Sequence, residues 1–172
     1  MQCFNLSNEV RSKEFFGFDW QFALTDSLNK PDINTEWRDV QLPHDWSVDY
    51  PISKDAPSCG SGGYARTGIG WYKRSFDLVY GNEQHLSLLF DGVYMNCTVW
   101  INDICVGGHV YGYTPFALDI TSAVHEGRND ILVRVDNSHQ PGSRWYSGSG
   151  ITRDVWLEAY GQVHIAQYGM YV

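Results

Sequence analysis

The chain has 172 residues, of which 15% are aromatic and 17 are glycine, and its formal net charge is −8 at pH 7. This length favours one domain that buries about two-thirds of the surface of its unfolded state. The acidic balance argues against a nucleic-acid partner, because the sequence has no basic stripe with interleaved aromatic residues. No run approaches the ~18 apolar residues of a membrane span, which argues against a membrane partner.

The first residues bear on the location of the protein in the cell. Residues 1–16 lack the apolar core of a secretory signal. We therefore expect a cytoplasmic protein, or a periplasmic one from which a signal has been removed. The sequence leaves both alternatives open.

Period-2 alternation and apolar runs between turn formers predict about nine antiparallel strands. They cover residues 15–24, 37–42, 70–78, 86–102, 104–106, 116–120, 129–136, 153–160 and 163–172. No segment has the periodicity of a long helix, so the expected fold class is all-β, an antiparallel sandwich. We assign residues 1–14 to an N-terminal extension and residues 15–172 to a single domain, which we expect to be a fragment of a larger multidomain protein.

One predicted hairpin turn decides how two of the four cysteines are arranged. A two-residue turn at Asn102-Asp103 pairs Trp100 with Cys105 and points Cys97 to the opposite face of the sheet. A disulfide between Cys97 and Cys105 is then excluded, and we expect all the cysteines to be free and mostly buried. Because the chain has no CxxC pair and no histidines at metal-ligand spacing, we expect no metal site.

Residues 136–157 include a loop between two predicted strands, and this loop carries the candidate site. It places Arg144, Trp145 and Tyr146 among glycines, although large rings normally belong to strands where they can be buried. A tightly folded glycine backbone can present such rings at a surface, where an indole meets the weakly apolar face of a pyranose. The pattern predicts either a sugar site or a loop that folds its rings over the open end of a β-core.

Two other motifs have catalytic or phosphate-binding interpretations that the sequence does not favour. His44 and Asp45 are adjacent in an extended segment, so their side chains point to opposite sides, and no nucleophile accompanies them. The glycines of the long loop 47–68 precede a strand and lack the Lys-Ser/Thr of a P-loop. We instead expect His44 and Trp46 to support the base of the loop in 136–157, and loop 47–68 to be functional or mobile.

Several blocks of the sequence resemble blocks of one known domain, and they occur in the same order as in that domain. They are residues 18–22 (FDWQF), 42–46 (LPHDW), 70–76 (GWYKRSF), 90–94 (FDGVY), 100–103 (WIND), 112–116 (GYTPF) and 148–157 (GSGITRDVWL). From residue 15 to residue 160 the chain resembles the N-terminal sugar-binding domain of glycoside hydrolase family 2, the β-galactosidase, β-glucuronidase and β-mannosidase group. The variant RWYSG at 144–148 is more similar to bacterial β-galactosidases than to β-glucuronidases.

The resemblance implies a jelly-roll β-sandwich of the galactose-binding-domain type, followed in the complete enzyme by an immunoglobulin-like domain and a TIM barrel. Family members hydrolyse β-glycosides with retention through two glutamates about 5 Å apart. The resemblance puts both glutamates on the barrel, so we expect no catalytic residue in this chain. It also implies no cofactor in this domain, Mg or Na on other domains of the complete enzyme, and a homo-oligomeric enzyme.

One short motif resembles a catalytic motif that the family carries on its barrel. Gly81-Asn82-Glu83 resembles the Asn-Glu acid/base motif of the family. Here it stands between two predicted strands, with no second glutamate in register. We interpret it as a hairpin turn.

The resemblance further implies that the loop in 136–157 reaches over the barrel mouth and contacts the terminal sugar. Arg144, Trp145 and Ser147 are the first candidates for this contact. Family members have an acidic residue where this chain has Arg144, and an arginine only donates hydrogen bonds. Either the loop follows a different path, or Asp136 or Asn137 becomes the acceptor for the sugar hydroxyls.

Residues outside this loop have other expected roles. Tyr64, in the glycine-rich loop, is a further candidate for sugar contact, because that loop can close the same site from the other side. Arg153 and Asp154 are expected to form a structural ion pair at the base of the loop. The tryptophans on predicted strands are expected to pack in the core or against other domains: Trp71, Trp100 and Trp156.

The function that we expect is the sugar-binding domain of a retaining family 2 glycosidase that hydrolyses terminal β-D-galactosides, with the isolated domain inactive. One alternative is a free-standing, lectin-like carbohydrate-binding module, and another is a β-glucuronidase or β-mannosidase domain. A third is a domain that only packs against its neighbours. That alternative predicts an exposed apolar patch near Trp156 or Tyr168.

Overall fold

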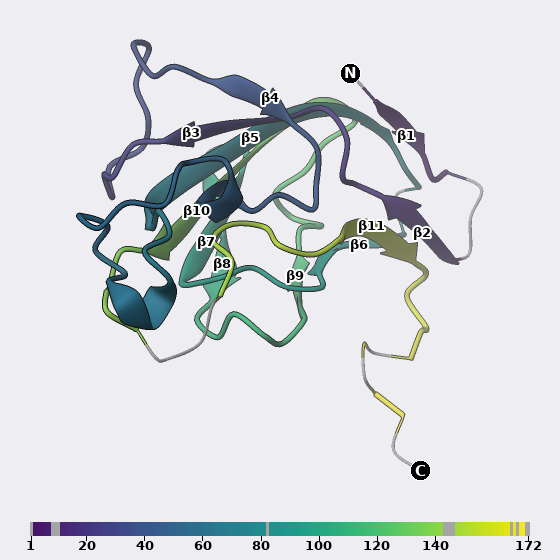
Figure 1. The fold of residues 1–172 in the computed structure, drawn as a ribbon. Helices are drawn as coiled ribbons and strands as arrows, with labels where there is room; N and C mark the ends of the chain where they lie inside the picture. Colours follow the sequence, from purple (N-terminus) through teal and green to yellow (C-terminus); the bar gives the residue numbers. More distant parts are fainter. Residues whose placement is uncertain are drawn as a thin grey trace.

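The computed structural model shows two β-sheets that face each other across one apolar core (Figure 1). It describes residues 2–7, 11–81, 83–142, 147–165, 167 and 169–170. The larger sheet has the strand order β4-β3-β5-β10-β7-β8, with β1 paired to β5, and the smaller sheet has the order β2-β11-β6-β9. This arrangement confirms the predicted all-β sandwich. All strand pairs are antiparallel except β1 with β5.

The described residues form eleven strands, where the sequence predicts about nine. The strands are β1 (Cys3–Asn5), β2 (Arg11–Phe15), β3 (Trp20–Leu24), β4 (Arg38–Val40), β5 (Gly68–Val79), β6 (His85–Phe90), β7 (Cys97–Ile101), β8 (Ile104–His109), β9 (Phe116–Asp119), β10 (Gly127–Asn137) and β11 (Val155–Tyr160). The helical elements among these residues are two 3₁₀ turns, η1 (Trp46–Val48) and η2 (Gly60–Gly62). No helix in the described part of the chain is long and apolar enough to cross a membrane.

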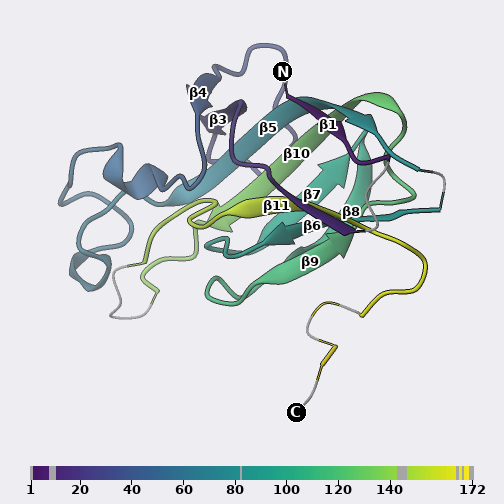
Figure 2. The same cartoon turned by 90° about the vertical axis from the view of Figure 1, so that its right-hand side faces the viewer.

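Strands β5 and β10 form the centre of the larger sheet, because they pair along their whole common length (Figure 2). Their alternating sequences put Tyr72 and Phe76 of β5 and Val133 of β10 on the inner face. The intervening residues, such as Lys73, face outward and are half-buried. A period of two residues is what a strand with one buried face requires.

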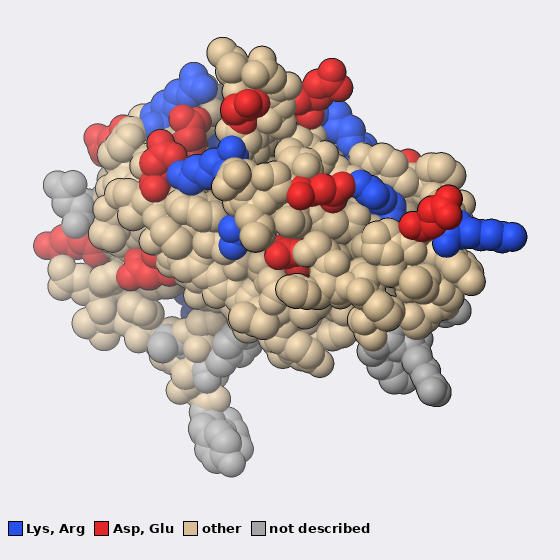
Figure 3. All heavy atoms as spheres, turned by 90° about the vertical axis from the view of Figure 1, so that its left-hand side faces the viewer, with Lys and Arg blue, Asp and Glu red and all other residues tan. Residues whose placement is uncertain are grey.

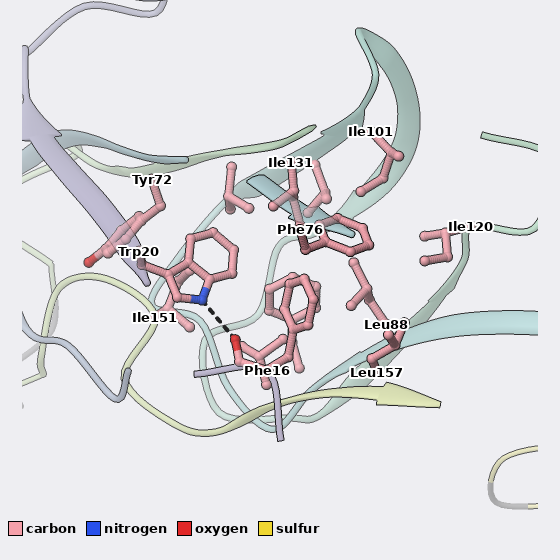
Figure 4. Packing of buried hydrophobic residues seen from close by; sticks show 14 of the residues in the cluster. Phe16, Trp20, Tyr72, Phe76, Leu88, Ile101, Ile120, Ile131, Ile151 and Leu157 are labelled. Atoms are coloured by element: carbon pink, nitrogen blue, oxygen red, sulfur yellow. Dashed lines mark hydrogen bonds between the residues drawn. The ribbon is translucent and has the colours of Figure 1, made fainter. Parts of the chain in front are cut away.

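The core lies between the sheets, where aromatic rings pack among aliphatic side chains (Figure 4). Phe16, Trp20 and Phe76 are fully buried, with the rings of Phe16 and Phe76 5.0 Å apart at an interplanar angle of 85°. The indole N–H of Trp20 donates to the carbonyl of Phe16 over 2.7 Å, so the buried polar atom has a partner. Burying each such ring stabilises the fold by about 1.5–3 kcal/mol.

The N-terminal residues take part in both sheets. We expected a single opening strand across residues 15–24, but residues 16–19 separate β2 from β3, and Asp19 has a φ of 57°. Strand β2 pairs with β11 in the smaller sheet, and β1 pairs with β5 in the larger one. Both strands lie largely in the residues that we assigned to an extension.

Two further strand predictions and one turn prediction differ from the structure. We expected one long strand over residues 86–102, but the structure has β6 and β7, which lie in different sheets. The turn predicted around Glu83 does connect two strands, but it is not a hairpin turn, because β5 and β6 also lie in different sheets. In the expected last strand, residues 163–172, the described residues form no strand.

The turn at Asn102-Asp103 is confirmed. Both residues have positive φ, 47° and 66°, and Ile101 faces Ile104 across the ladder. Trp100 pairs with Cys105, as predicted, and a bulge follows between Val99 and Trp100. The four cysteines are free, but only Cys97 is buried, so the expectation that most are buried is wrong.

Candidate functional site

Loops that are far apart in sequence meet at one end of the sandwich, which we call the loop end. Residues from 58–67, 94–95 and 137–142, together with Ser147, line a common hollow there. In Figure 1 the segment around η2 lies beside the loop that follows β10. The structure thus brings the glycine-rich loop and the loop in 136–157 to the same place.

The base of the loop in 136–157 is held by residues 44–47. The carboxylate of Asp45 accepts hydrogen bonds from the backbone N–H of Ser149 (2.8 Å) and from that of Ser47 (2.9 Å). The backbone N–H of Trp46 donates to the carbonyl of Ser149 over 2.9 Å, and that of His44 donates to Ile151 over 2.8 Å. These bonds confirm that His44 and Trp46 support the loop base.

Gly150 is required where the two segments touch. Its φ is +130°, a conformation that favours glycine. A Cβ atom there would lie 2.3 Å from the hydroxyl of Tyr72 and 2.6 Å from the carbonyl oxygen of His44. The backbone therefore approaches closely at a point where no side chain fits.

His44 belongs to a network of polar side chains beneath this contact. Its Nε2 lies 2.9 Å from the carboxylate of Asp49, and its Nδ1 lies 2.7 Å from the hydroxyl of Tyr72. A carboxylate only accepts, so neutral His44 donates from Nε2 and accepts the Tyr72 proton at Nδ1. Arg38 also donates to Asp49. Asp49, Tyr72 and Arg38, whose Nη2 lies 3.2 Å from Nε2, are thus the side-chain neighbours of the His44 ring nitrogens, and the adjacent Asp45 is not.

Burial determines the charge state of the network. The side chain of His44 is 10% exposed, and desolvation lowers its pKa even though the hydrogen bond to Asp49 opposes that shift. The pKa of Asp49 is also lowered: burial would raise it, but the hydrogen bonds from Arg38 and His44 prevail. Desolvation raises the pKa of the fully buried Tyr72 well above its usual value. The network supports the loop as a neutral His–Tyr pair beside an Arg–Asp ion pair.

The hollow at the loop end is small and polar. Its volume is about 40 Å³, which is room for about one water molecule and not for a sugar ring. Thr67 lines the hollow, and its hydroxyl is buried and has no hydrogen-bond partner among the described residues. A buried hydroxyl without a partner costs about 1–3 kcal/mol, so this atom is placed to bind a water or a ligand group.

The structure places the predicted site residues in different surroundings. Asn137 and Ser147 both line the hollow. Asn137 is 3% exposed and already bonded, because its amide donates to Ser149 (2.8 Å) and its oxygen accepts from Gln140 (3.0 Å).

Two other candidates, Asp136 and Tyr64, lie outside the lining of the hollow. Asp136 faces the opposite side of β10 and accepts from the backbone N–H and the hydroxyl of Ser138. Tyr64 is 40% exposed and lies against Gly60 of its own loop. Arg144 and Trp145 lie outside the described residues, as does Tyr168.

Arg153 and Asp154 do not behave as expected. Within the described part of the chain no ion pair joins them. Both instead line a shallow cleft that also includes Asp91 and Pro115. The prediction of a structural ion pair is therefore wrong.

The strand tryptophans pack on the outer faces of the sheets. The rings of Trp71 and Trp100 stack 5.7 Å apart on the larger sheet. Trp156, on the smaller sheet, is half-buried against Phe15 and donates to Asp91 over 2.8 Å. It therefore does not form the exposed apolar patch considered above. Among the described residues no group of three His, Cys, Asp or Glu side chains could hold a metal ion.

Sequence reasoning missed Thr67, Asp49 and the role of Tyr72. The pattern of β5 places Tyr72 on the inner face, but its partner His44 is 28 residues away and Asp49 lies in a 3₁₀ cap. No local spacing marks these residues as a group. Only the packing of loops at one end of the sandwich brings them together.

Comparisons with known proteins agree on one family. Residues 16–161 match the family described as "Glycosyl hydrolases family 2, sugar binding domain". The chain is 40% identical over 167 residues to a protein named Beta-galactosidase BoGH2A from Bacteroides ovatus, covering 94% of this chain and 20% of that protein. It is 38% identical over 156 residues to a "Putative beta-glucuronidase" from Formosa agariphila, covering 87% of this chain and 15% of that protein.

A solved structure shows the same fold. It is a glycosyl hydrolase family 2 member from Bacteroides cellulosilyticus, with a TM-score of 0.77 and 39% identity. The match covers 86% of this chain and 20% of that chain. This chain thus spans about a fifth or less of the length of these relatives.

Proposed function

The chain belongs to the sugar-binding domain of glycosyl hydrolase family 2, and from that premise we propose that it serves a β-galactosidase by contacting the terminal β-D-galactoside. The matched relatives are much longer, which supports further domains in the complete protein. In this proposal an immunoglobulin-like domain and a TIM barrel follow, and two glutamates of the barrel cleave the glycosidic bond with retention. This domain alone then has no hydrolytic activity.

The observation that carries the proposal is the polar hollow at the loop end. Two loops close on it, and Thr67, whose buried hydroxyl has no partner among the described residues, is part of its lining. The hollow holds about one water, so in this proposal the sugar lies over its opening and a sugar hydroxyl reaches Thr67 directly or through that water. Ser147 lines the hollow, and Arg144 and Trp145 remain candidates for contact with the sugar.

The charge of the lining supports a neutral sugar. Among the described residues that line the hollow none is Lys or Arg. A glucuronide carries a carboxylate, which is bound best by arginine or lysine, whereas galactose has only hydroxyl groups. The described part of the site therefore favours a galactoside.

A β-glucuronidase is the second candidate. Two relatives named "Putative beta-glucuronidase", at 38% and 36% identity, favour it, and Arg144 is a cation that could pair with a uronate. The two candidates differ in what Arg144 does. For a galactoside it donates one hydrogen bond among several, and for a glucuronide it is the ionic partner.

The complete enzyme in this proposal is a homo-oligomer. This domain binds no metal, and Mg or Na ions belong to other domains. A free-standing carbohydrate-binding module has the weaker support, because the relatives named here extend far beyond the matched region.

The test is a titration of the ¹⁵N-labelled chain with methyl β-D-galactoside and, separately, with methyl β-D-glucuronide. We expect millimolar binding of the galactoside, with shifts at the amides of Thr67, His139 and Ser147, and no turnover of a chromogenic β-galactoside. Thr67→Val keeps the shape of the side chain but removes the hydroxyl, so it should weaken binding about five- to tenfold while the fold remains stable.

Four results would overturn the proposal. Turnover by this chain would place catalysis here. Tighter binding of the glucuronide would favour the second candidate. Shifts that avoid the loop end, or binding that Thr67→Val leaves unchanged, would remove the hollow from sugar recognition.

A further inference from the structure

A second, larger cleft lies away from the loop end. It lies on the outer face of the larger sheet and has a volume of about 930 Å³, within the range of small-molecule sites. Its lining shares no residue with that of the loop-end hollow. We call this cleft the outer groove and define it by Gln21, Lys73, Trp100, Arg128, Asp130 and Leu132.

The floor of the outer groove is a row of side chains that crosses four neighbouring strands. The ladders pair Gln21 of β3 with Lys73 of β5, Lys73 with Leu132 of β10, and Leu132 with Trp100 of β7. Figures 1 and 2 show these strands side by side. With strands about 4.8 Å apart, the row spans about 14 Å, which is longer than one pyranose ring.

The row and its neighbours offer both kinds of hydrogen-bonding group. Gln21 and Lys73 supply an amide and an ammonium group. The next row supplies Ser75 and Asp130, which bond to each other, with Arg128 donating to Ser75 over 3.1 Å. Such a surface can both donate to and accept from hydroxyl groups.

The charges of the lining nearly cancel. The lining contains the carboxylates of Asp19, Asp39, Asp103 and Asp130 and the cations of Lys73, Arg74 and Arg128, that is, four against three. On the face drawn in Figure 3, Lys and Arg likewise lie beside Asp and Glu, and neither sign forms a continuous patch. This balance suits an uncharged polar ligand and does not suit a polyanion.

The aromatic side chains around the groove are held in place before any ligand binds. Trp100 stacks on Trp71 at 5.7 Å, and Lys30 lies over its ring at 5.4 Å while bonding to Asp103 at 2.9 Å. The ammonium group of Lys73 lies 4.1 Å from the ring centre of Trp37. Fixed side chains lose little conformational entropy on binding.

The apolar part of the lining is too limited to dock a protein helix. Leu132 and Trp100 are its half-buried apolar side chains on the outer face, and polar groups surround both. Recognition of an amphipathic helix needs a continuous apolar strip that accepts several anchors. A chain of sugar rings needs one ring-sized apolar contact and many hydrogen bonds, which is what this groove provides.

We propose that the outer groove binds a neutral β-linked oligosaccharide, with one ring against Trp100 and Leu132 and hydroxyl groups bonded to Gln21, Lys73 and Asp130. This site is separate from the loop-end site of the proposed function and does not depend on it. It gives the domain a hold on a longer glycan while the loop end contacts a terminal sugar.

The test uses the ¹⁵N-labelled chain and β-1,4-galactotetraose as the probe, with galactose as the single-ring comparison. We expect saturable shifts at the Trp100 indole N–H and at the amides of Lys73 and Leu132, and much weaker binding of galactose at these positions. Lys73→Ala should raise the Kd about tenfold, the loss expected for one hydrogen bond from a charged donor. Leu132→Arg, which fills the floor, should abolish the shifts.

Lys13→Ala is the matched control. Lys13 also lies over an indole, 4.8 Å from the ring centre of Trp156, but on the smaller sheet. It should leave the Kd unchanged, and thermal unfolding should show that all variants are folded. No saturable shift at Trp100, shifts confined to the loop end, or an equal effect of Lys13→Ala would each overturn the proposal.

Discussion

At the scale of single residues, polar side chains at the loop end hold the loops in place. Asp45, Asn137 and His44 all look like candidates for chemistry in the sequence, yet their hydrogen bonds go to other parts of the loop end. Asn137 in particular uses both its amide and its oxygen internally. The Thr67 hydroxyl, which has no partner among the described residues, is a group left for a ligand that the sequence did not mark.

The His44 network makes the stability of the domain depend on pH. Unfolded, His44 titrates near pH 6.5, whereas burial lowers its pKa in the folded protein. As the pH falls below about 6.5, the unfolded state takes up the proton first, so the free energy of unfolding falls by at most about 1.4 kcal/mol per pH unit from this group. Above that pH His44 is neutral in both states, so it no longer makes the free energy of unfolding depend on pH.

Urea unfolding between pH 7.5 and pH 5 measures this effect, because this range brackets the ordinary histidine pKa of about 6.5. His44→Gln cannot titrate, so its stability should vary less with pH than that of the natural chain, and the two curves should converge towards acid. Asp49 has a lowered pKa and adds a loss of stability only at lower pH. Parallel curves for the two proteins would show that His44 binds a proton equally in both states.

Gly150 gives a second prediction at this scale. Gly150→Ala introduces a methyl group 2.3 Å from the Tyr72 hydroxyl at a φ of +130°, so strain and overpacking add. We expect the free energy of unfolding to fall by at least about 2 kcal/mol. Gly161→Ala is the control, because nothing lies within 4 Å of its Cβ position. Equal urea midpoints for the two variants would contradict the close approach.

At the scale of elements, the sequence predicts strands well where one face is buried and the other is not. The alternation in β5 and β10 gave their positions to within a few residues, and Asn102-Asp103 gave the β7–β8 turn. Strands β6 and β7 are both apolar, although the chain passes from one sheet to the other between them. The hydrophobic pattern of residues 86–101 therefore does not show where β6 ends and β7 begins. Strand β1 is three residues long, too short for any period to be visible.

The same limit applies to the candidate site. The sequence identified the two loops that meet at the loop end, because both are rich in glycine and long. It could not identify Thr67 or Asp49, since their roles follow from contacts made after folding. Spacing within a loop carries no information about which other loop it touches.

Strand β1 nevertheless holds the sandwich together. Phe4 is 3% exposed and packs 5.3 Å from Phe16 and 6.2 Å from Phe76. Gln2, just before it, accepts a hydrogen bond from Arg74 over 2.7 Å, and burial lowers the pKa of this arginine to about 10, so that it stays charged at neutral pH.

Phe4→Ala tests whether residues 1–14 are a dispensable extension. Losing a buried ring leaves a cavity, and we expect the free energy of unfolding to fall by about 3 kcal/mol in a urea titration. Cys3→Ala, at an exposed position of the same strand, should change it by less than about 0.5 kcal/mol. If both variants match the natural chain, β1 adds nothing to the stability of the sandwich.

At the scale of the whole molecule, the sandwich separates its surfaces by role. The loop end carries the polar hollow and several exposed apolar side chains on neighbouring loops, among them Val48 (79% exposed), Ile52 (75%) and Val110 (69%). Such a mixture suits a surface that meets both a sugar and another domain of the enzyme proposed above. The outer groove lies on the face of the larger sheet and draws on other residues.

This separation predicts that the two binding events are independent. The linings of the hollow and the groove share no residue, and no titratable network joins Thr67 to Lys73 among the described residues. Thr67→Val should therefore weaken binding of methyl β-D-galactoside at the loop end without changing the Kd of β-1,4-galactotetraose at the groove. Lys73→Ala should do the reverse. NMR titrations of both variants with both ligands measure the four constants. The effects should add in the double variant within about 0.5 kcal/mol, as for distant sites. If either substitution changes the Kd values of both ligands, the two surfaces form one extended site. The sandwich then binds a single glycan along its length, from the terminal ring to the interior rings.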